Sequence, residues 1–191
     1  MTKQNITNAI YKRRAVRSYK KQRISDDIIE SLLDAAIHAP TAMHQEAWSF
    51  AIIQDRNLLK QISDISKTFL AQARQNPDSP FHAKSLDHFI DPDFDIFYNA
   101  DTLIVIYGKT DSPFISADCW LAAENLMLTA CDTGLGSCVI GLAVEALNGA
   151  EMRNILEIPN NLTAFAPIIL GYPSAETPAT SRKKAQIIFR K

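Results

Sequence analysis

Apolar residues recur at helical spacing in four segments of the chain. Positions three and four residues apart predict helices over residues 5–14, 26–39, 56–74 and 113–133. Ser25 precedes the second helix as its cap, and Pro40 is expected to end it. The fourth helix, with Ser112 as cap and Gly134 as stop, is apolar on nearly all sides. This pattern is typical of a central helix or of one shared with a partner chain.

Shorter apolar runs predict the strands. They lie at residues 48–54, 103–107, 137–140 and 164–170, with a last possible strand at 185–189. A short helix is expected over residues 148–156, where Asn148 and Glu151 have the spacing of a capping box. Two helices precede any strand and the strands are unevenly spaced, which favours an α+β fold over a simple βαβ series. With 191 residues, the chain 1–191 is expected to form a single domain.

The helical and strand patterns both break between residues 75 and 100. Prolines, histidines and aspartates are scattered through this segment, which predicts an excursion or lid on the domain. Phe94, Phe97 and Tyr98 are candidates either for contacts with a flat substrate or for the core. His82 and His88 are chemically able to bind a metal, but their spacing matches no closed site. No metal site is predicted.

Charge is distributed unevenly along the chain. The net charge is −1, yet the first 25 residues carry eight basic and no acidic residues, and the segment after Glu176 carries five basic and no acidic ones. The part between them therefore has a charge of −14. If the two basic ends meet in space they form an anion site, and otherwise they are solvated ends. Nucleic acid is a weaker interpretation, because few aromatic residues interleave with the basic ones.

Several classes of protein are disfavoured by what the chain lacks. It has no stretch of roughly 20 apolar residues and no secretory signal pattern, so we expect a cytoplasmic protein without a membrane span. Cys119, Cys131 and Cys138 form no CxxC pair, which suits free thiols in a reducing compartment. The common nucleotide, hydrolase and metalloprotease motifs are absent. The glycines of GLGSCVIG lack dinucleotide-binding spacing, so a helix stop and tight turn explain them equally well.

Four segments, taken together, resemble the nitroreductase family of FMN-dependent oxidoreductases. They occur in the family's order along nearly the whole chain: RRAVRSY at residues 13–19, APTAMHQEAW at 39–48, ENLMLTACDTGLGSCVIG at 124–141 and APIILGYP at 166–173. The resemblance implies an α+β sandwich with a central, mostly antiparallel sheet flanked by helices. It also implies an intertwined homodimer formed through the long central helix.

The resemblance also implies which residues bind FMN. Arg13, Arg14 and Ala15 match the stretch that contacts the ribityl chain, phosphate and pyrimidine edge, and Arg17 and Arg182 match two phosphate-binding residues. Guanidinium groups suit this role because they hold phosphate through paired hydrogen bonds. Ile140 and Gly141 match the segment near flavin N5, which the resemblance assigns to the partner subunit.

The chain departs from the family pattern around one of these residues. His44 stands where the family has Asn, with Glu46 for Gln and Ala47 for Pro, and Ala15 replaces a usual Ser. His44 still offers a hydrogen bond to a flavin edge, and its charge depends on pH. We therefore expect an altered flavin potential or substrate choice.

By resemblance, hydride passes from NADH or NADPH to flavin N5 and then to an electrophilic acceptor such as a nitroaromatic or a quinone. No side chain need act as an acid or a nucleophile, because the cofactor carries the chemistry. Two alternatives remain. The departures around His44 are compatible with a flavin storage or sensing protein that has little turnover. A basic-ended interaction protein without cofactor is the third interpretation.

Overall fold

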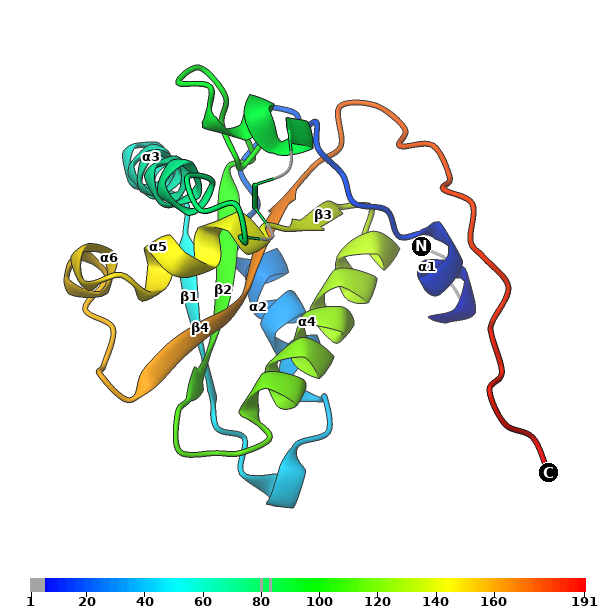
Figure 1. Cartoon of the computed structure of the whole chain (residues 1–191). Helices are drawn as coiled ribbons and strands as arrows, with labels where there is room; N and C mark the ends of the chain where they lie inside the picture. Colours follow the sequence, from blue (N-terminus) through cyan, green and yellow to red (C-terminus); the bar gives the residue numbers. More distant parts are fainter. Residues whose placement is uncertain (1–5, 80, 83) are drawn as a thin grey trace.

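The fold is built on a four-stranded antiparallel sheet (Figure 1). The computed structural model describes residues 6–79, 81, 82 and 84–191. The strands, in their order across the sheet, are β1 (Trp48–Ile53), β2 (Thr102–Lys109), β4 (Leu162–Gly171) and β3 (Gly136–Val139). Neighbouring strands are distant in the sequence, because helices and loops separate β1 from β2, β2 from β4 and β3 from β4.

Helices cover both faces of this sheet (Figure 1). α2 (Asp26–Ile37) and α4 (Ile115–Asp132) pack on one face, while α3 (Arg56–Ala73) and α5 (Val144–Asn148) pack on the other. The remaining helical elements are α1 (Ile6–Lys12), η1 (Ala42–His44), η2 (Lys84–Ile90), η3 (Gly141–Ala143) and α6 (Ala150–Ile155). This arrangement confirms the expected α+β sandwich.

Strand β2 divides the interior into two cores. Ile104 and Ile106 face the core shared with α2 and α4, whereas Leu103, Val105 and Tyr107 face the core shared with α3 and α5. Alternate residues of a strand point to opposite faces of a sheet, so a strand covered on both sides is apolar at every position. This is why residues 103–107 form a continuous apolar run.

The expected helices and strands occur with small shifts at their ends, apart from two corrections. The helix predicted over residues 148–156 is two short helices, α5 and α6, that meet at Gly149. The Asn148 side chain does not cap a helix. It accepts a hydrogen bond from Ala164 N at 2.8 Å and donates one to Ala164 O at 3.1 Å. Asn148 is therefore used to attach α5 to β4, and the predicted capping box is wrong.

The second correction concerns the C-terminal segment. Residues 185–189 form no strand, and residues 178–191 are all exposed (Figure 1). Backbone groups of a strand need a neighbouring strand, and this segment runs away from the sheet. At the other end, the expected start of the first helix at Asn5 lies outside the described residues. Among the described helices, none is long and apolar enough to cross a membrane.

Candidate functional site

The basic segment near the N-terminus, residues 12–23, lies against the free edge of β3 and the end of β4. Val16 N donates to Ser137 O at 3.0 Å, and Ala15 and Ser137 form a parallel bridge. Lys20 N then donates to Tyr172 O at 2.8 Å. Because its backbone is paired in this way, the segment presents its arginine side chains from a fixed position.

Arg13 and Arg14 line a cavity with a volume of about 450 Å³. Its walls come from the end of α1, the end of α4 with the start of β3, and the segment after β4. Its other lining residues are Lys12, Val16, Cys131, Gly134, Leu135, Gly136, Ser137, Pro173, Ala175, Glu176, Thr177 and Ala179. Three cationic side chains and one carboxylate therefore surround the cavity, which favours an anionic ligand.

The hydrogen bonds of Arg14 leave one buried donor for a ligand. Its Nη1 donates to Tyr11 O at 2.6 Å and to Arg13 O at 2.9 Å, which fixes the guanidinium plane. Its Nε is buried and has no hydrogen-bond partner among the described residues. Leaving a buried charged donor unpaired is costly, so an oxygen-rich anion at this place would remove the penalty. Arg13 pairs with Glu124, at 3.7 Å between Nε and Oε1.

Arg17 lies in a second, smaller cavity of about 130 Å³. Tyr98 and Phe89 line it from the segment before β2, and Ile140 and Gly141 line it from the end of β3. The Arg17 guanidinium carbon lies 5.9 Å from the centre of the Tyr98 ring, within the range of a cation–π contact. This cavity therefore combines a cation, an aromatic ring and exposed backbone.

The surroundings of Gly141 differ from the expectation for this segment. The resemblance assigned Ile140 and Gly141 to a partner subunit, but they lie beside Arg17 of their own chain. The cause is the bridge between Ala15 and Ser137, which places the end of β3 next to the basic segment. A Cβ built on Gly141 meets nothing within 4 Å, so the space in front of this glycine is open.

His44 lies in a strained turn at the other end of α4. Met43, His44 and Glu46 all have positive φ values, of 56°, 52° and 45°, which side chains other than glycine rarely adopt. Ala42 N anchors the turn by donating to the buried carboxylate of Asp118, at 3.2 and 3.3 Å. Clusters of such residues are typical of functional sites, where the surrounding structure maintains the strain.

The single chain does not bring all the expected site residues together. His44 is attached to Asp118 in the first turn of α4, whereas Arg13 shares its cavity with Cys131 in the last turn. Thirteen residues of helix separate these two turns, a distance of about 20 Å. Arg182 lies in the exposed C-terminal segment, where its Nη1 donates to Thr180 Oγ1 at 2.6 Å.

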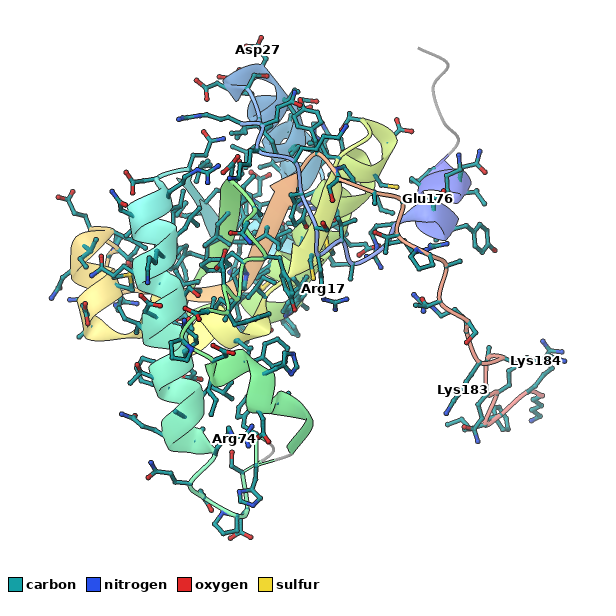
Figure 2. All side chains as sticks on the ribbon, turned by 90° about the horizontal axis from the view of Figure 1, so that it is seen from above. Arg17, Asp27, Arg74, Glu176, Lys183 and Lys184 are labelled. Carbon is teal, nitrogen blue, oxygen red and sulfur yellow. The ribbon has the colours of Figure 1, made fainter. Side chains whose placement is uncertain are left out.

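The two basic ends of the chain meet only in part. Ser174 N donates to Ser18 O at 3.1 Å, so the chain just after β4 runs beside the basic N-terminal segment. The cations of the C-terminal segment lie farther along it, and Figure 2 shows Lys183 and Lys184 far from Arg17. The expected anion site is therefore formed mainly by the N-terminal arginines in one chain.

The sequence alone did not identify the residues that hold Arg17 and the His44 turn in place. The sequence is compatible with either a core role or a substrate contact for Tyr98, and the structure places its half-buried ring against Arg17. Asp118 and Ser112 support the His44 turn, and Ser112 Oγ donates to Gln45 Oε1 at 2.8 Å instead of capping α4. Sequence carries no signal for these roles, because each contact joins residues far apart in the chain.

The cysteines near the site are not set up as nucleophiles. Cys138 lines the cavity of Arg17, and burial raises the pKa of its thiol although Arg17 acts in the opposite direction. Burial likewise raises the pKa of Cys119 to about 12. Both thiols are therefore neutral near pH 7. Within the described part of the chain, no three His, Cys, Asp or Glu side chains are grouped as for a metal ion.

Comparison with known proteins bears directly on this site. The description of the nitroreductase family matches residues 10–172, which include Arg13, Arg17, His44 and Gly141. A protein of Archaeoglobus fulgidus with the provisional name NADH dehydrogenase/NAD(P)H nitroreductase is 32% identical over 167 residues, which are 87% of this chain and 84% of that protein. An iodotyrosine deiodinase of Thermotoga neapolitana is 26% identical over 183 residues, covering 93% and 94% of the two chains.

Solved structures agree with the fold. A nitroreductase of Bacteroides fragilis with bound FMN superposes with a TM-score of 0.83 at 24% identity, over 98% of this chain and all of that one. A nitroreductase of Desulfitobacterium hafniense with bound FMN gives a TM-score of 0.81 at 21% identity, over 97% and 98% of the chains. The fold, the family match and the relative at 32% identity lead to one conclusion: the chain belongs to the nitroreductase family.

Proposed function

We propose that this protein is an FMN-dependent oxidoreductase that takes electrons from NADH or NADPH and reduces an electrophilic acceptor such as a nitroaromatic or a quinone. The observation that carries this proposal is that arginines of the basic segment line two cavities. One holds Arg13 and Arg14, and the other holds Arg17 and Gly141. The family match and the flavin in related structures support it.

The larger cavity suits the phosphate and ribityl part of FMN. Its volume of about 450 Å³ lies in the usual range for small-ligand sites. Arg14 Nε is a buried donor without a described partner, and Arg13 and Lys12 add positive charge. Ala15, in place of the family's Ser, removes one hydroxyl donor, so the guanidinium groups supply more of the binding.

The smaller cavity suits the flavin ring. Bound flavin would supply the two-electron chemistry between nicotinamide and acceptor. Arg17 provides a fixed positive charge there, which would stabilise negative charge that develops on the ring. Gly141 leaves space for close approach to its backbone, because no side chain stands in front of it.

His44 belongs to the same site only if a second copy of the chain supplies it. Two copies related by a two-fold axis along antiparallel α4 helices bring the first turn of one α4 beside the last turn of the other. His44 of the second copy then faces Arg13 and Arg14 of the first, and the dimer contains two such sites. The exposed Trp120 and Leu121 on α4 provide apolar surface for this contact.

The area of exposed surface favours the same assembly. The chain exposes 11,959 Å², whereas a compact monomer of 21.3 kDa is expected to expose about 9,100 Å². Exposed apolar side chains on α1 and on the C-terminal segment include Ile6, Tyr11, Ile188 and Phe189. Exposed apolar residues of this kind are typical of surfaces that bind a partner subunit.

The visible absorption spectrum of the purified protein tests the proposal. It is recorded before and after anaerobic addition of NADH and, in a second sample, of NADPH. We expect a flavin spectrum that bleaches with at least one donor and returns when a quinone is added. The two samples also identify the preferred donor.

Two other outcomes have distinct meanings. A flavin that stays oxidised with both donors would contradict the proposed turnover and favour flavin storage or sensing. A colourless protein that does not bind added FMN would overturn the cofactor assignment itself.

A further inference from the structure

Lys67 is the one lysine or arginine that is buried among the described residues, with 8% of its surface exposed. It lies in the fourth turn of α3, on the face turned toward the segment that precedes β2. A buried ammonium group carries three N–H donors and is stable only when acceptors surround it. The hydrogen-bond acceptors around Lys67 indicate its structural role.

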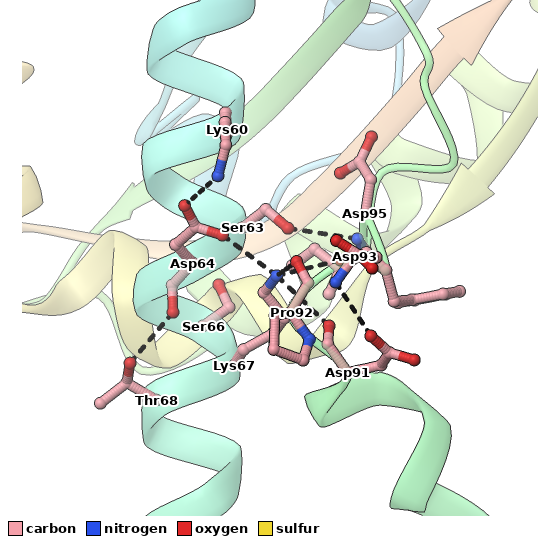
Figure 3. Close-up of polar contacts among 12 residues, drawn as sticks. Lys60, Ser63, Asp64, Ser66, Lys67, Thr68, Asp91, Pro92, Asp93 and Asp95 are labelled. Carbon is pink, nitrogen blue, oxygen red and sulfur yellow. Dashed lines mark hydrogen bonds and ion pairs between the residues drawn. The ribbon is translucent and has the colours of Figure 1, made fainter.

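Three acceptors lie close to the Lys67 ammonium (Figure 3). Pro92 O lies at 2.9 Å, Phe94 O at 3.1 Å and Asp64 Oδ1 at 3.0 Å from Nζ. Asp91 O is more distant, at 3.5 Å. The backbone of residues 91–94 therefore curves around one buried cation.

A second contact one turn earlier on α3 holds the next part of the segment. Ile96 N donates to the buried Ser63 Oγ at 3.2 Å. Beyond it, Asp95 accepts hydrogen bonds from Phe97 N at 2.9 Å and Asn99 N at 2.8 Å. Residues four apart share one face of a helix, so Ser63 and Lys67 act side by side on residues 91–99.

This segment ends at the aromatic ring that contacts Arg17. Tyr98 and Asn99 have positive φ values of 54° and 57°, a strained backbone that its surroundings must hold. Phe94 packs edge-to-face on Tyr98, with ring centres 5.5 Å apart. The Tyr98 ring in turn lies 5.9 Å from the Arg17 guanidinium carbon. A continuous series of contacts thus joins Lys67 to Arg17.

We propose that Lys67 is a positioning residue of the oxidoreductase site: by binding the carbonyl groups of Pro92 and Phe94, it holds Tyr98 against Arg17 and so directs the guanidinium into the cavity at Gly141. The flavin part of this role rests on the proposed function. The residue touches neither cofactor nor substrate, and it acts through the loop that it fixes.

Lys60 provides a matched control. It lies on the same helix and also binds Asp64, with its Nζ 2.5 Å from Oδ2, but its side chain is exposed and it is not a donor to the carbonyl groups of residues 91–94. Lys67→Met keeps the length of the side chain and removes the ammonium. Lys60→Met makes the same chemical change outside the loop.

The first test is a double-mutant cycle on FMN affinity, measured by quenching of flavin fluorescence. We expect Lys67→Met and Arg17→Met each to weaken FMN binding by about tenfold, and Lys60→Met to change it less than about threefold. In the Arg17→Met background, Lys67→Met should weaken FMN binding by less than about a further threefold, because its effect on FMN passes through Arg17. Additive effects, or unchanged affinity in a folded Lys67→Met protein, would overturn the proposal.

The second test needs no cofactor. Hydrogen exchange of the apoprotein reports on the amides of Ile96, Phe97 and Asn99, and Lys67→Met should speed their exchange by about tenfold while Lys60→Met leaves it unchanged. Unchanged exchange would mean that Lys67 does not hold the loop. If the wild-type chain bound no FMN, the proposed function and the directing role would fail together, while exchange would still report on the loop.

A third variant covers the case in which Lys67→Met does not fold. Tyr98→Leu removes the ring and leaves the Lys67 contacts in place. We expect it to weaken FMN binding without an additional effect in the Arg17→Met background, and to preserve slow exchange at Ile96 and Phe97. An effect of Tyr98→Leu that adds fully to that of Arg17→Met would contradict the proposal.

Discussion

Two arginines at the end of α1 differ in how firmly they are held. Arg14 is fixed by backbone carbonyl groups and keeps a buried Nε without a described partner, whereas Arg13 has a long ion pair with Glu124. A donor that is already fixed loses little side-chain entropy on binding a ligand. Arg14 is therefore the residue at which a single substitution tests the phosphate site most directly.

We expect Arg14→Met to weaken FMN binding by about tenfold to a hundredfold. A hydrogen bond to a charged group contributes about 1.5–3 kcal/mol, and each 1.4 kcal/mol corresponds to about a factor of ten. Fluorescence titration measures the dissociation constant, and Lys21→Met, at an exposed lysine of the same basic segment, serves as the control. Less than a threefold change in Arg14→Met would place the phosphate elsewhere.

The Asp64 carboxylate predicts a pH dependence of stability. Hydrogen bonds from Lys60 and Lys67 lower its pKa below the ordinary 3.8, although burial acts in the opposite direction. A carboxylate with a depressed pKa contributes stability above its unfolded-state pKa, and this is lost as the pH falls through the folded-state value. Asp64→Asn should therefore destabilise the protein at pH 7.

The size of this effect is limited by exposure. About half of the Asp64 side chain is exposed, so solvent screens the ion pairs and the loss should not exceed about 1 kcal/mol. Urea unfolding at pH 7 and near pH 3 measures it. The difference between Asp64→Asn and wild type should shrink at the lower pH, and a difference that grows there would be inconsistent with this assignment.

At the scale of elements, the contact between the basic segment and β3 depends on a glycine. A Cβ at Gly136 would lie 2.7 Å from Val16 Cβ and Cγ2, too close for two packed side chains. Val16 is itself fixed by its hydrogen bond to Ser137, so it cannot move away without breaking the bridge that places Ala15. The position of the arginines relative to β3 therefore requires glycine here.

Gly136→Ala and Gly141→Ala form a matched pair of variants. Gly136→Ala should lower the free energy of unfolding by about 1–3 kcal/mol through overpacking. Gly141→Ala should change it by less than about 0.5 kcal/mol, because its Cβ meets nothing within 4 Å, but should weaken FMN binding by filling the open space. Urea unfolding and FMN titration separate the two effects. Equal stabilities of the two variants would contradict this account of Gly136.

At the scale of the whole molecule, the exposed C-terminal segment is compatible with the proposed dimer. Ile187, Ile188 and Phe189 are 61%, 95% and 77% exposed at the end of a segment that leaves the body of the domain. In a dimer this segment reaches the second copy and brings Arg182 with it. This would give Arg182, which the resemblance matches to a phosphate-binding residue, a place that the single chain does not provide.

We expect the protein to sediment with twice the 21.3 kDa mass of the chain. Deleting residues 177–191 should raise the dimer dissociation constant by about tenfold or more, since burial of apolar side chains contributes about 25 cal/mol per Å². Sedimentation equilibrium measures both, and replacing Lys183 and Lys184 by Gln tests whether charge alone is responsible. A truncated chain that dimerises as tightly as the full chain would show that the segment does not join the subunits.

Local patterns in the sequence determined much of this protein. The apolar spacing of residues 26–39 and 56–74 predicted α2 and α3, and the continuous apolar run at 103–107 predicted the strand β2. The clustering of Arg13, Arg14 and Arg17 predicted an anion site, and the four motifs predicted the family. The helices, the strand and the anion site depend on residues close together in the chain, whose spacing the sequence displays directly. The family resemblance depends on the order of four short motifs.

Tertiary structure decided how these pieces combine. It paired Ala15 with Ser137, which placed Gly141 beside Arg17 of the same chain, and it put His44 at the opposite end of α4. It also buried Lys67, one of many lysines in the sequence, where its ammonium group binds the loop of residues 91–99. Strand order, burial and the path of a loop result from contacts between residues far apart in the chain, and no local pattern specifies which distant partner a residue will meet.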